Sequence, residues 1–250
     1  MENAERTNRH LLDLCRRSDR TASWVYSGFL SPAEQEDFHR CPESASFDYS
    51  FSGGYSDAER RILAAGNADR IGTLPDPPIS VIAVHPSSPK FAEDLSHRDY
   101  LGAILSLGIE RSLIGDILVR EKSAWFFCID SAVDFLTSSL TRIRNTAVSA
   151  SLSSAEAPEL RPRYESVRVN VASERLDAVL SAFTGLSREQ TASLFRGEKV
   201  FVNHRIVTDK SFRLKEGDIL SVRGFGKAAY DGIDHETRKS RLWVSLRKYV

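Results

Sequence analysis

Two proline-containing segments constrain the fold of this chain more than any other feature, because they interrupt every regular element that reaches them. Leu74–Pro78 holds three prolines among its five residues, and a proline removes a backbone hydrogen-bond donor and fixes φ at about −65°. Ser153–Arg163 is rich in alanine, proline and glutamate and is predicted to be a linker. The 250 residues therefore divide into three predicted domains, at 1–75, 76–155 and 163–250.

The first domain is predicted to be mainly helical, with one short extended piece. An apolar stripe begins at His10–Cys15, and Ser31, followed by a proline and then an acid, is typical of a helix start. Phe47–Phe51 alternates between apolar and polar residues and predicts a strand. Asp57–Ala64 predicts a further helix.

The middle domain shows strand and helix patterns in the order β-α-β-β-α-β. The predicted strands cover Ile79–His85, Ile114–Arg120, Ala124–Ile129 and Thr146–Leu152. The predicted helices cover Ser96–Leu107 and Ser131–Leu136, and the second is expected to be capped by Ser131 or Asp130. This order is typical of a split βαβ sandwich.

The last domain begins with two short helices and continues as strands. The helices are predicted at Arg175–Phe183 and Ser187–Phe195, and Gly197 is expected to end the second. Strands are predicted at Val200–Asn203, Arg205–Val207, Ile219–Val222 and Leu242–Tyr249. A mainly helical first domain, a split βαβ domain and a last domain of two helices followed by strands make the predicted fold class α+β.

The net charge of zero hides an asymmetry between the two ends of the chain. From Arg163 onward there are 17 Lys and Arg against 11 Asp and Glu, whereas the residues before it hold 17 basic and 23 acidic side chains. A basic part carried on an acidic body indicates a partner with many negative charges.

The sequence also argues against several kinds of protein. Cys15, Cys41 and Cys128 have a spacing that fits neither a zinc site nor a disulfide framework, and no nucleotide-binding fingerprint occurs, so neither a metal nor a cofactor is expected. No run of about 18 apolar residues suits a membrane span, and the first residues resemble neither a secretory signal nor a transit peptide. A cytoplasmic monomer is the expectation.

The most specific motif lies in the last domain. Its parts are Arg175–Asp177, Ser187–Arg188, Arg196–Asn203, Lys210–Ser211 and Leu214–Ile219. Across nearly its whole length this pattern resembles an S4 RNA-binding domain, with the same order of helices and strand and the same spacing. The resemblance implies that this domain binds structured RNA.

The resemblance and the chemistry of basic side chains together indicate a concave RNA-binding face. Arginine offers a planar fork to phosphate oxygens, and helix N-termini also favour anions. Asp177 is expected to hold Arg175 in the first helical turn rather than to contact RNA. The predicted RNA-binding residues are Arg175, Ser187, Arg188, Gln190, Arg196, Lys199, Asn203, Arg205 and Lys210.

Two further stretches narrow the family. With the S4 pattern behind them, Ser52–Arg60 and Ser96–Val119 resemble the YlmH family of bacterial S4-domain proteins. This resemblance implies a helical N-terminal domain, a central RNA-recognition-like domain and a C-terminal S4 domain. It implies a role on large ribosomal subunits that still carry peptidyl-tRNA after stalling, in ribosome-associated quality control, and a link to cell division. The implied partners are rRNA, tRNA, the large subunit and another quality-control protein.

A cluster of polar residues in the central domain raises the question of catalysis. His97, Arg98 and Asp99 adjoin one another and Asp116 follows on the next strand, so an acid-base group is conceivable. His97 and Asp99, however, are two residues apart on a predicted helix and do not face each other. Ser96 is expected to cap the helix, and His97 and Arg98 are candidates for a secondary contact. No catalytic residue is predicted.

The aromatic run in the central domain does not predict base stacking. Trp125–Phe127 places three rings in succession, so at least two of them must be core residues whichever face the strand presents. A standard RNA-recognition motif stacks bases on strand aromatics. This domain is therefore expected to contact protein or the RNA backbone instead.

Three function classes fit an S4 domain. The preferred hypothesis is a non-catalytic factor that binds rRNA and tRNA on the large subunit. The alternative is an RNA-modifying enzyme similar to a pseudouridine synthase, but its aspartate motif would have to be Arg175–Asp177, which the S4 helix already uses, and such enzymes typically carry the S4 domain first in the chain. A heat-shock-type S4 protein would be shorter and would need no central domain.

Overall fold

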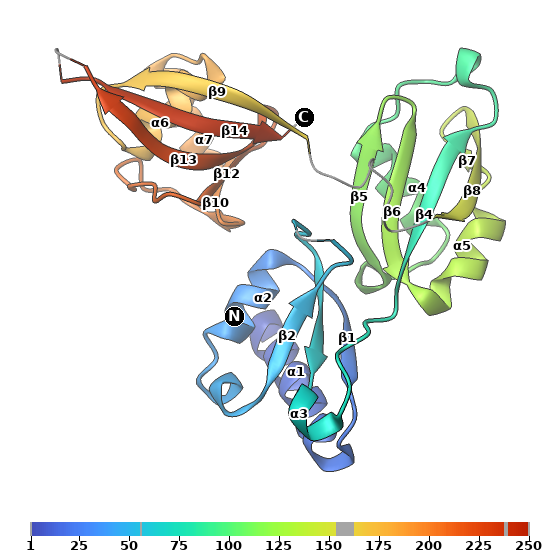
Figure 1. Ribbon diagram of the computed structural model, residues 1–250. Helices are drawn as coiled ribbons and strands as arrows, with labels where there is room; N and C mark the ends of the chain where they lie inside the picture. The colour runs from blue at the N-terminus through green and yellow to red at the C-terminus, as the bar shows by residue number, and fades with distance from the viewer. Residues whose placement is uncertain (1, 56, 154–162, 238–239, 250) are drawn as a thin grey trace. The chain divides into compact units, whose positions relative to one another are not determined.

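The computed structural model describes residues 2–55, 57–153, 163–237 and 240–249. The chain divides into two compact units, Met1–Arg161 and Pro162–Val250, and each is described by itself (Figure 1). Most of the predicted linker Ser153–Arg163 lies outside the described residues. No helix in the described ranges is long and apolar enough to cross a membrane.

The first unit begins with helices around a three-stranded antiparallel sheet of order β1-β3-β2. Its elements are α1 (Glu2–Thr21), β1 (Val25–Leu30), α2 (Pro32–His39), the 3-10 helix η1 (Pro42–Ser46), β2 (Tyr49–Ser52), β3 (Arg61–Ala65) and α3 (Ala68–Ile71). Leu11 and Cys15 of α1 and Phe38 of α2 are buried against Leu63 of β3. The apolar stripe that starts at His10 thus forms the helical side of this core.

The helix start predicted at Ser31 is confirmed in detail. The Ser31 hydroxyl accepts a hydrogen bond from the backbone N–H of Glu34 at 3.3 Å, and the Ser31 N–H donates to the Glu34 carboxylate at 2.7 Å. Pro32 occupies the first helical position, where no N–H is needed. This reciprocal capping satisfies two backbone donors that the helix itself leaves unpaired.

The helix predicted at Asp57–Ala64 is wrong, because Arg61–Ala65 is strand β3. Its residues Ile62 to Ala65 are fully buried between β1 and β2, so the segment is the centre of the sheet. Alanine, leucine and arginine favour a helix locally, but the pairing of both strand edges overrides that preference. The neighbouring strand prediction at Phe47–Phe51 is confirmed by β2.

The second half of this unit has the predicted β-α-β-β-α-β order. Its elements are β4 (Ile79–Pro86), the 3-10 helix η2 (Pro89–Phe91), α4 (His97–Ser106), η3 (Arg111–Leu113), β5 (Ile114–Arg120), β6 (Ser123–Ile129), η4 (Asp130–Ala132), α5 (Val133–Ser139), β7 (Arg142–Ile143) and β8 (Thr146–Ser153). The sheet order is β5-β6-β4-β8-β7. The predicted cap of α5 is wrong: η4 precedes the helix, and Ala132 takes the N-cap position.

The two faces of this central sheet are buried by different partners. One face packs on α4 and α5 through Ile82, Phe126 and Leu136. The other face is covered by residues of the three-stranded sheet, because Phe29 and Ile62 join a buried cluster that holds Val81, Ala83, Trp125 and Phe127.

Close backbone approaches fix this contact between the two sheets. A Cβ at Gly115 would lie 2.7 Å from the ring of Phe29, and a Cβ at Gly54 would lie 2.7 Å from the ring of Phe127. The ring of Tyr55 stacks on that of Phe127 with centroids 5.0 Å apart. The aromatic side chains on the outer face of the central sheet are therefore core residues, as the run Trp125–Phe127 predicts.

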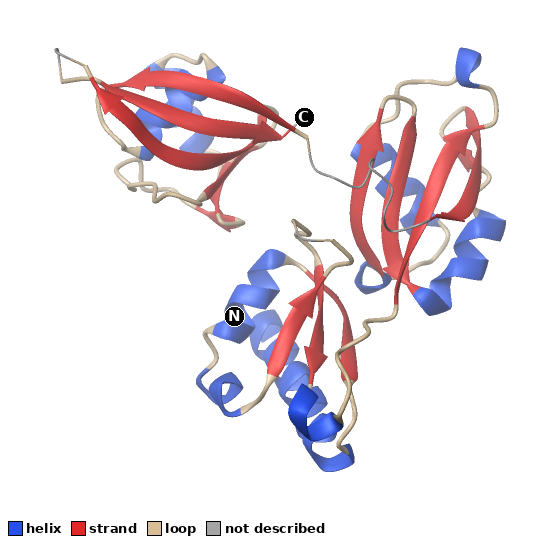
Figure 2. Ribbon diagram, in the orientation of Figure 1, coloured by secondary structure: helices blue, strands red, loops and turns tan. Residues whose placement is uncertain are grey.

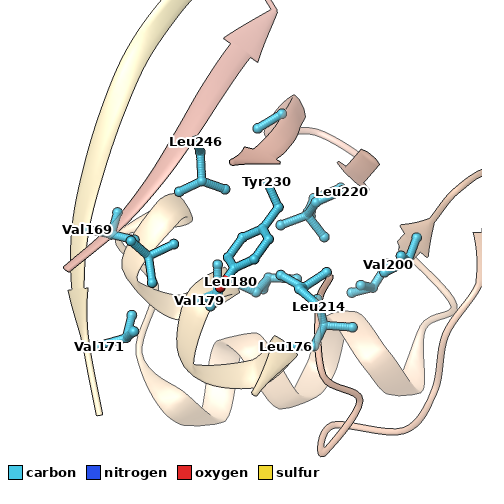
Figure 3. Packing of buried hydrophobic residues seen from close by; sticks show 14 of the residues in the cluster. Val169, Val171, Leu176, Val179, Leu180, Val200, Leu214, Leu220, Tyr230 and Leu246 are labelled. Atoms are coloured by element: carbon cyan, nitrogen blue, oxygen red, sulfur yellow. The ribbon is translucent and has the colours of Figure 1, made fainter. Parts of the chain in front are cut away.

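The second unit is a six-stranded antiparallel sheet, order β11-β10-β12-β13-β14-β9, with two helices on one face (Figure 2). Its elements are β9 (Tyr164–Val171), α6 (Leu176–Thr184), α7 (Arg188–Arg196), β10 (Val200–Val202), β11 (Arg205–Ile206), β12 (Ile219–Val222), β13 (Gly226–Glu236) and β14 (Leu242–Tyr249). Figure 3 shows Val169 and Leu246 from the strands meeting Val179 and Leu180 from α6 around Tyr230.

The two helices and the four strands predicted for the last domain are confirmed. Asn203 and His204, which join β10 to β11, have φ of 49° and 65°, as a two-residue hairpin turn requires. Strands β9 and β13 were not predicted. Both pair with β14 along most of its length, so they supply two of the six strands in the sheet that the helices pack on.

Candidate nucleic-acid interface

Local chemistry fixes where helices α6 and α7 of the S4 pattern begin. Arg175 is the N-cap of α6. Ser187 caps α7, since its hydroxyl accepts from the Gln190 N–H at 3.3 Å and its own N–H donates to the Gln190 side-chain oxygen at 3.0 Å. Ser187 and Gln190, both predicted RNA contacts, thus already use these groups within the helix cap.

A groove of about 600 Å³ lies beside the starts of these helices. Four of its lining residues are basic, namely Arg175, Arg188, Lys210 and Arg241. Its remaining lining is mostly alanine, serine and other small or polar residues, which let a sugar-phosphate backbone approach closely. The structure therefore brings together three of the predicted RNA-binding residues and adds Arg241.

The four basic residues are not equally available. The Arg175 guanidinium donates to both carboxylate oxygens of Asp177 at 3.1 and 3.0 Å, as predicted. Arg241 donates to the side-chain oxygen of Asn170 and, at 2.8 Å, to its backbone carbonyl. Within the described ranges Arg188 and Lys210 make no ion pair, so these exposed side chains are the two cations left to meet an anion.

The other predicted RNA-binding residues lie outside this groove. Arg196 is exposed in the last turn of α7, about 12 Å along the axis from Arg188 at 1.5 Å per residue. Lys199 is exposed where α7 leads into β10. Asn203 donates to Asp218 at 2.8 Å and accepts from the Ile219 N–H at 2.9 Å, so its side chain stabilises a turn.

Arg205 differs from the rest of the predicted set because it is partly buried. It lies in β11, an edge strand of two residues, and its Nε is enclosed by protein atoms. A half-buried guanidinium has less freedom to follow an RNA backbone than an exposed one. Arg205 is therefore the predicted contact with the least accessible side chain.

The central polar cluster resolves into a helix cap and an internal contact. The Asp99 carboxylate accepts from the Ser96 N–H at 2.9 Å and from its hydroxyl at 2.6 Å, so the predicted cap at Ser96 is confirmed. Partial desolvation and the charge of Arg111 lower the pKa of His97, which favours the neutral ring. Arg98 is exposed on the same helix.

Asp116 is a buried acceptor that joins the two sheets of the first unit. It accepts hydrogen bonds from the N–H of Glu59 at 2.7 Å, the N–H of Arg60 at 3.1 Å and the Tyr55 hydroxyl at 2.9 Å. Burial raises the pKa of Asp116, although these bonds and the charges of Arg60 and Arg111 oppose the rise.

Arg60 completes the same contact from the other side. Its guanidinium donates to the backbone carbonyls of Ile114 at 3.0 Å, Phe29 at 2.8 Å and Arg111 at 3.2 Å. Asp116 and Arg60 both lie in the stretches that suggested the YlmH resemblance. Those stretches hold the N-terminal and central sheets together.

Sequence reasoning missed Arg241 and its partner Asn170. Arg241 precedes β14 and Asn170 lies in β9, 71 residues earlier, and β9 was not predicted. The alternation of Val167, Val169 and Val171 with polar residues was a usable strand signal. No sequence pattern near these strands indicates that they lie close to the S4 helices.

The comparisons with known proteins agree with this arrangement. Two family models match the chain: the putative RNA-binding domain in YlmH over residues 76–157 and the S4 domain over residues 174–220. Ribosome-associated protein quality control protein P2 of Bacillus subtilis (strain 168) is 30% identical over 229 residues, which cover 88% of this chain and 85% of that relative.

A solved structure is also similar. It is the cell division protein ylmH from Streptococcus pneumoniae, with a TM-score of 0.50 at 22% identity. The match covers 62% of this chain and 93% of that one. At this identity the likeness bears on the fold alone.

Proposed function

Because the chain belongs to the YlmH family of RNA-binding, ribosome-associated quality-control proteins, we propose that it binds rRNA and tRNA on the large ribosomal subunit. Its role there is to stabilise peptidyl-tRNA on stalled large subunits while quality control proceeds. It acts by binding and carries out no chemical step. It works in the cytoplasm, as a monomer.

The observation that carries this proposal is the basic groove at the starts of α6 and α7. Arg188 and Lys210 present their charges there beside small residues. A-form RNA offers a wide, shallow surface of phosphates and 2′-hydroxyls, which proteins bind by shape and charge. A groove with exposed cations and polar walls suits that surface.

The hydrogen bonds of the central cluster support a binding role rather than catalysis. Asp99 is used by a helix cap, and Asp116 is used by the contact between the two sheets. A general acid or base must reach a substrate proton, and a carboxylate enclosed by three protein donors is poorly placed to do so. His97 and Arg98 remain candidates for a secondary RNA contact.

The predicted domains at 1–75, 76–155 and 163–250 have different roles. The last domain docks on RNA through the groove. The first two form a joined body, locked by Arg60 and Asp116, which sets orientation on the subunit or recruits another quality-control protein.

The test is sucrose-gradient sedimentation of tagged protein from lysate, with tRNA probed in the protein-bound fractions. The wild type should migrate with large subunits that carry tRNA. Arg188→Ala/Lys210→Ala should shift to the top of the gradient, because losing two charge-assisted contacts to phosphate costs roughly 2–4 kcal/mol. Affinity should also fall steeply with salt as bound counterions are released.

The matched control is Arg40→Ala/Lys215→Ala, which removes one arginine and one lysine from exposed positions outside the groove. It should sediment as the wild type does. A wild-type protein that stays at the top of the gradient would contradict the proposal and redirect the search to free RNA and modified bases. A groove variant that sediments normally would place the RNA contact elsewhere.

A further inference from the structure

The face of the C-terminal sheet turned away from α6 and α7 carries a continuous row of side chains across five strands. Phe201 pairs with Ser221, and Ser221 pairs with Lys227. The register of β13 with β14 continues from Lys227 to Tyr249, which pairs with Tyr164 on β9. Their strand neighbours point the other way, into the core, so this row lies on one face.

Each aromatic ring of this row has a cation over it. The three pairs are Arg223 over Phe201 at 5.1 Å, Lys227 over Tyr249 at 4.2 Å and Arg247 over Tyr164 at 5.3 Å from the ring centroid. We call these six residues the outer row. The two tyrosine rings also touch edge to face, with centroids 4.9 Å apart.

The outer row is accessible within this unit. Arg223 and Arg247 are exposed and the three rings are half-buried, while both helices of the unit lie on the opposite face (Figure 1). A depression of about 370 Å³ opens beside Phe201 and Arg223. Phe225, in the turn that joins β12 to β13, is 39% exposed next to it.

The charge of the outer row narrows what can cover it. It brings three cations together, and one of them, Arg247, donates to the Asp231 carboxylate at 2.9 and 3.0 Å. An apolar partner would cover the three cations and offer them no negative charge of its own, which is costly. A partner that supplies both negative charges and flat rings can interact with the cation and with the ring of each pair.

We propose that the outer row is a second RNA-binding surface, which takes unpaired nucleotides by stacking their bases on Phe201, Tyr249 and Tyr164 while Arg223, Lys227 and Arg247 meet the phosphates. In the free protein each cation lies over its ring. In the complex the bases take the ring faces and the cations turn to the backbone. Base–aromatic stacking tolerates any sequence because every base has a π-face.

This surface is separate from the groove. Tyr164 and Val171 mark opposite ends of β9, which places them about 23 Å apart at 3.3 Å per residue. The groove lies at the Val171 end and the outer row at the Tyr164 end. The proposal shares with the proposed function only the class of ligand, so each can fail without the other.

The experiment measures binding of a fluorescent, unstructured oligouridine to the full chain. Its length is about ten nucleotides, within the span that stacking surfaces of this size accept. Tyr164→Ala/Tyr249→Ala should weaken binding roughly fivefold or more per ring. Tyr164→Phe/Tyr249→Phe keeps the rings and should bind as the wild type does, which separates stacking from hydroxyl contacts and from misfolding.

Two controls make the result specific. Lys90→Ala/Phe91→Ala removes an exposed cation and ring from the first unit, where Lys90 lies 5.7 Å from the Phe91 centroid, and should change nothing. Arg188→Ala/Lys210→Ala removes the groove cations and should leave most oligouridine binding intact while it abolishes migration with subunits.

Each other outcome overturns the proposal. Oligouridine binding that survives loss of both tyrosines excludes stacking at the outer row. Binding lost only in the groove variant places single strands in the groove and leaves the proposed function standing. Equal affinity for an abasic oligonucleotide or an acidic peptide would mean that binding depends on charge alone and that the rings do not contribute to it.

Discussion

The central sheet and the C-terminal sheet are built alike but present opposite outer faces. Each is antiparallel and packs two helices on one face. In the central sheet the other face is buried, with Trp125 8% exposed and Phe127 fully enclosed. In the C-terminal sheet the corresponding face carries the outer row, whose rings are half-buried and each accompanied by a cation.

The difference shows what decides whether an aromatic strand face becomes core or surface. Phe127 lies in a cluster of apolar and aromatic side chains that Phe29 and Ile62 complete. The charged groups of the same contact, Asp116 and Arg60, have hydrogen-bond partners within it. Around Tyr249, by contrast, the register places Lys227 on the adjoining strand. Covering that face with an apolar sheet would also take the exposed guanidinium groups of Arg223 and Arg247 out of water, so an apolar cover is unfavourable there.

The largest expected effect comes from breaking the covered face. Phe127→Ala removes the ring on which Tyr55 stacks, and loss of a fully buried phenylalanine costs about 3–5 kcal/mol. Urea unfolding followed by hydrogen exchange should show the loss in β1 to β6 and not in the second unit. The control Phe91→Ala, at a site 80% exposed, should change stability by less than about 0.5 kcal/mol; similar losses in both variants would mean that the face is not covered in solution.

A smaller loss of stability is expected when the hydrogen bonds of the same contact between the two sheets are removed. Asp116→Ala leaves the Glu59 and Arg60 N–H groups without their acceptor, and unsatisfied buried donors cost about 2–3 kcal/mol in total. Thermal unfolding of the wild type and the variant measures this loss of stability. Asp13→Ala, which breaks an exposed ion pair with Arg16, should cost under about 1 kcal/mol. Equal effects would contradict the role of Asp116 as a lock between the sheets.

On the open face, the salt dependence of oligouridine binding should distinguish the contribution of the cations from that of the rings. Arg223→Ala/Arg247→Ala should lower the slope of log affinity against log salt for oligouridine by about 1.4, at 0.7 per phosphate contact on a single strand. Tyr164→Ala/Tyr249→Ala should weaken binding at every salt concentration and leave the slope unchanged. A slope that changes equally in both variants would mean that the rings act only by positioning the cations.

The smallest expected effect is a pH dependence that only the open face should show. Burial lowers the pKa of Lys227 to about 8, so its ammonium is lost as pH rises through that value. Oligouridine affinity should fall about two- to threefold from pH 7 to 9, the loss of one weak cationic contact. Lys227→Arg keeps its charge and should abolish the dependence.

The same pKa shift has an opposite consequence for stability. Because the native pKa of Lys227 is the lower one, the unfolded chain binds more protons between about pH 8 and its ordinary pKa of 10.5. Stability should therefore rise across that window. Comparing the wild type with Lys227→Met by urea unfolding at pH 7.5 and 10 measures this rise, and an equal pH dependence in both proteins would exclude Lys227 as its source.

Helix starts and most strands could be predicted because their signals are local. Ser31, Ser96 and Ser187 each precede an acid or glutamine by three residues, and each forms the reciprocal cap that this spacing allows. The groove could be predicted only in part. Arg175, Arg188 and Lys210 follow from the S4 pattern. Arg241 lies beside them because β14 pairs with β9, and no nearby residue indicates that pairing.

By itself, the sequence of this protein determined the β-α-β-β-α-β order of the central domain, the caps of α2, α4 and α7, the S4 motif and the basic character of the last domain, because each of these depends on residues close together along the chain. Only the tertiary structure decided that Arg61–Ala65 is a strand, that the central sheet is covered on both faces, and that the outer row is assembled from four strands and the turn after β12. These outcomes depend on pairing between segments far apart in sequence, and long-range register overrides local propensity wherever both edges of a strand are paired.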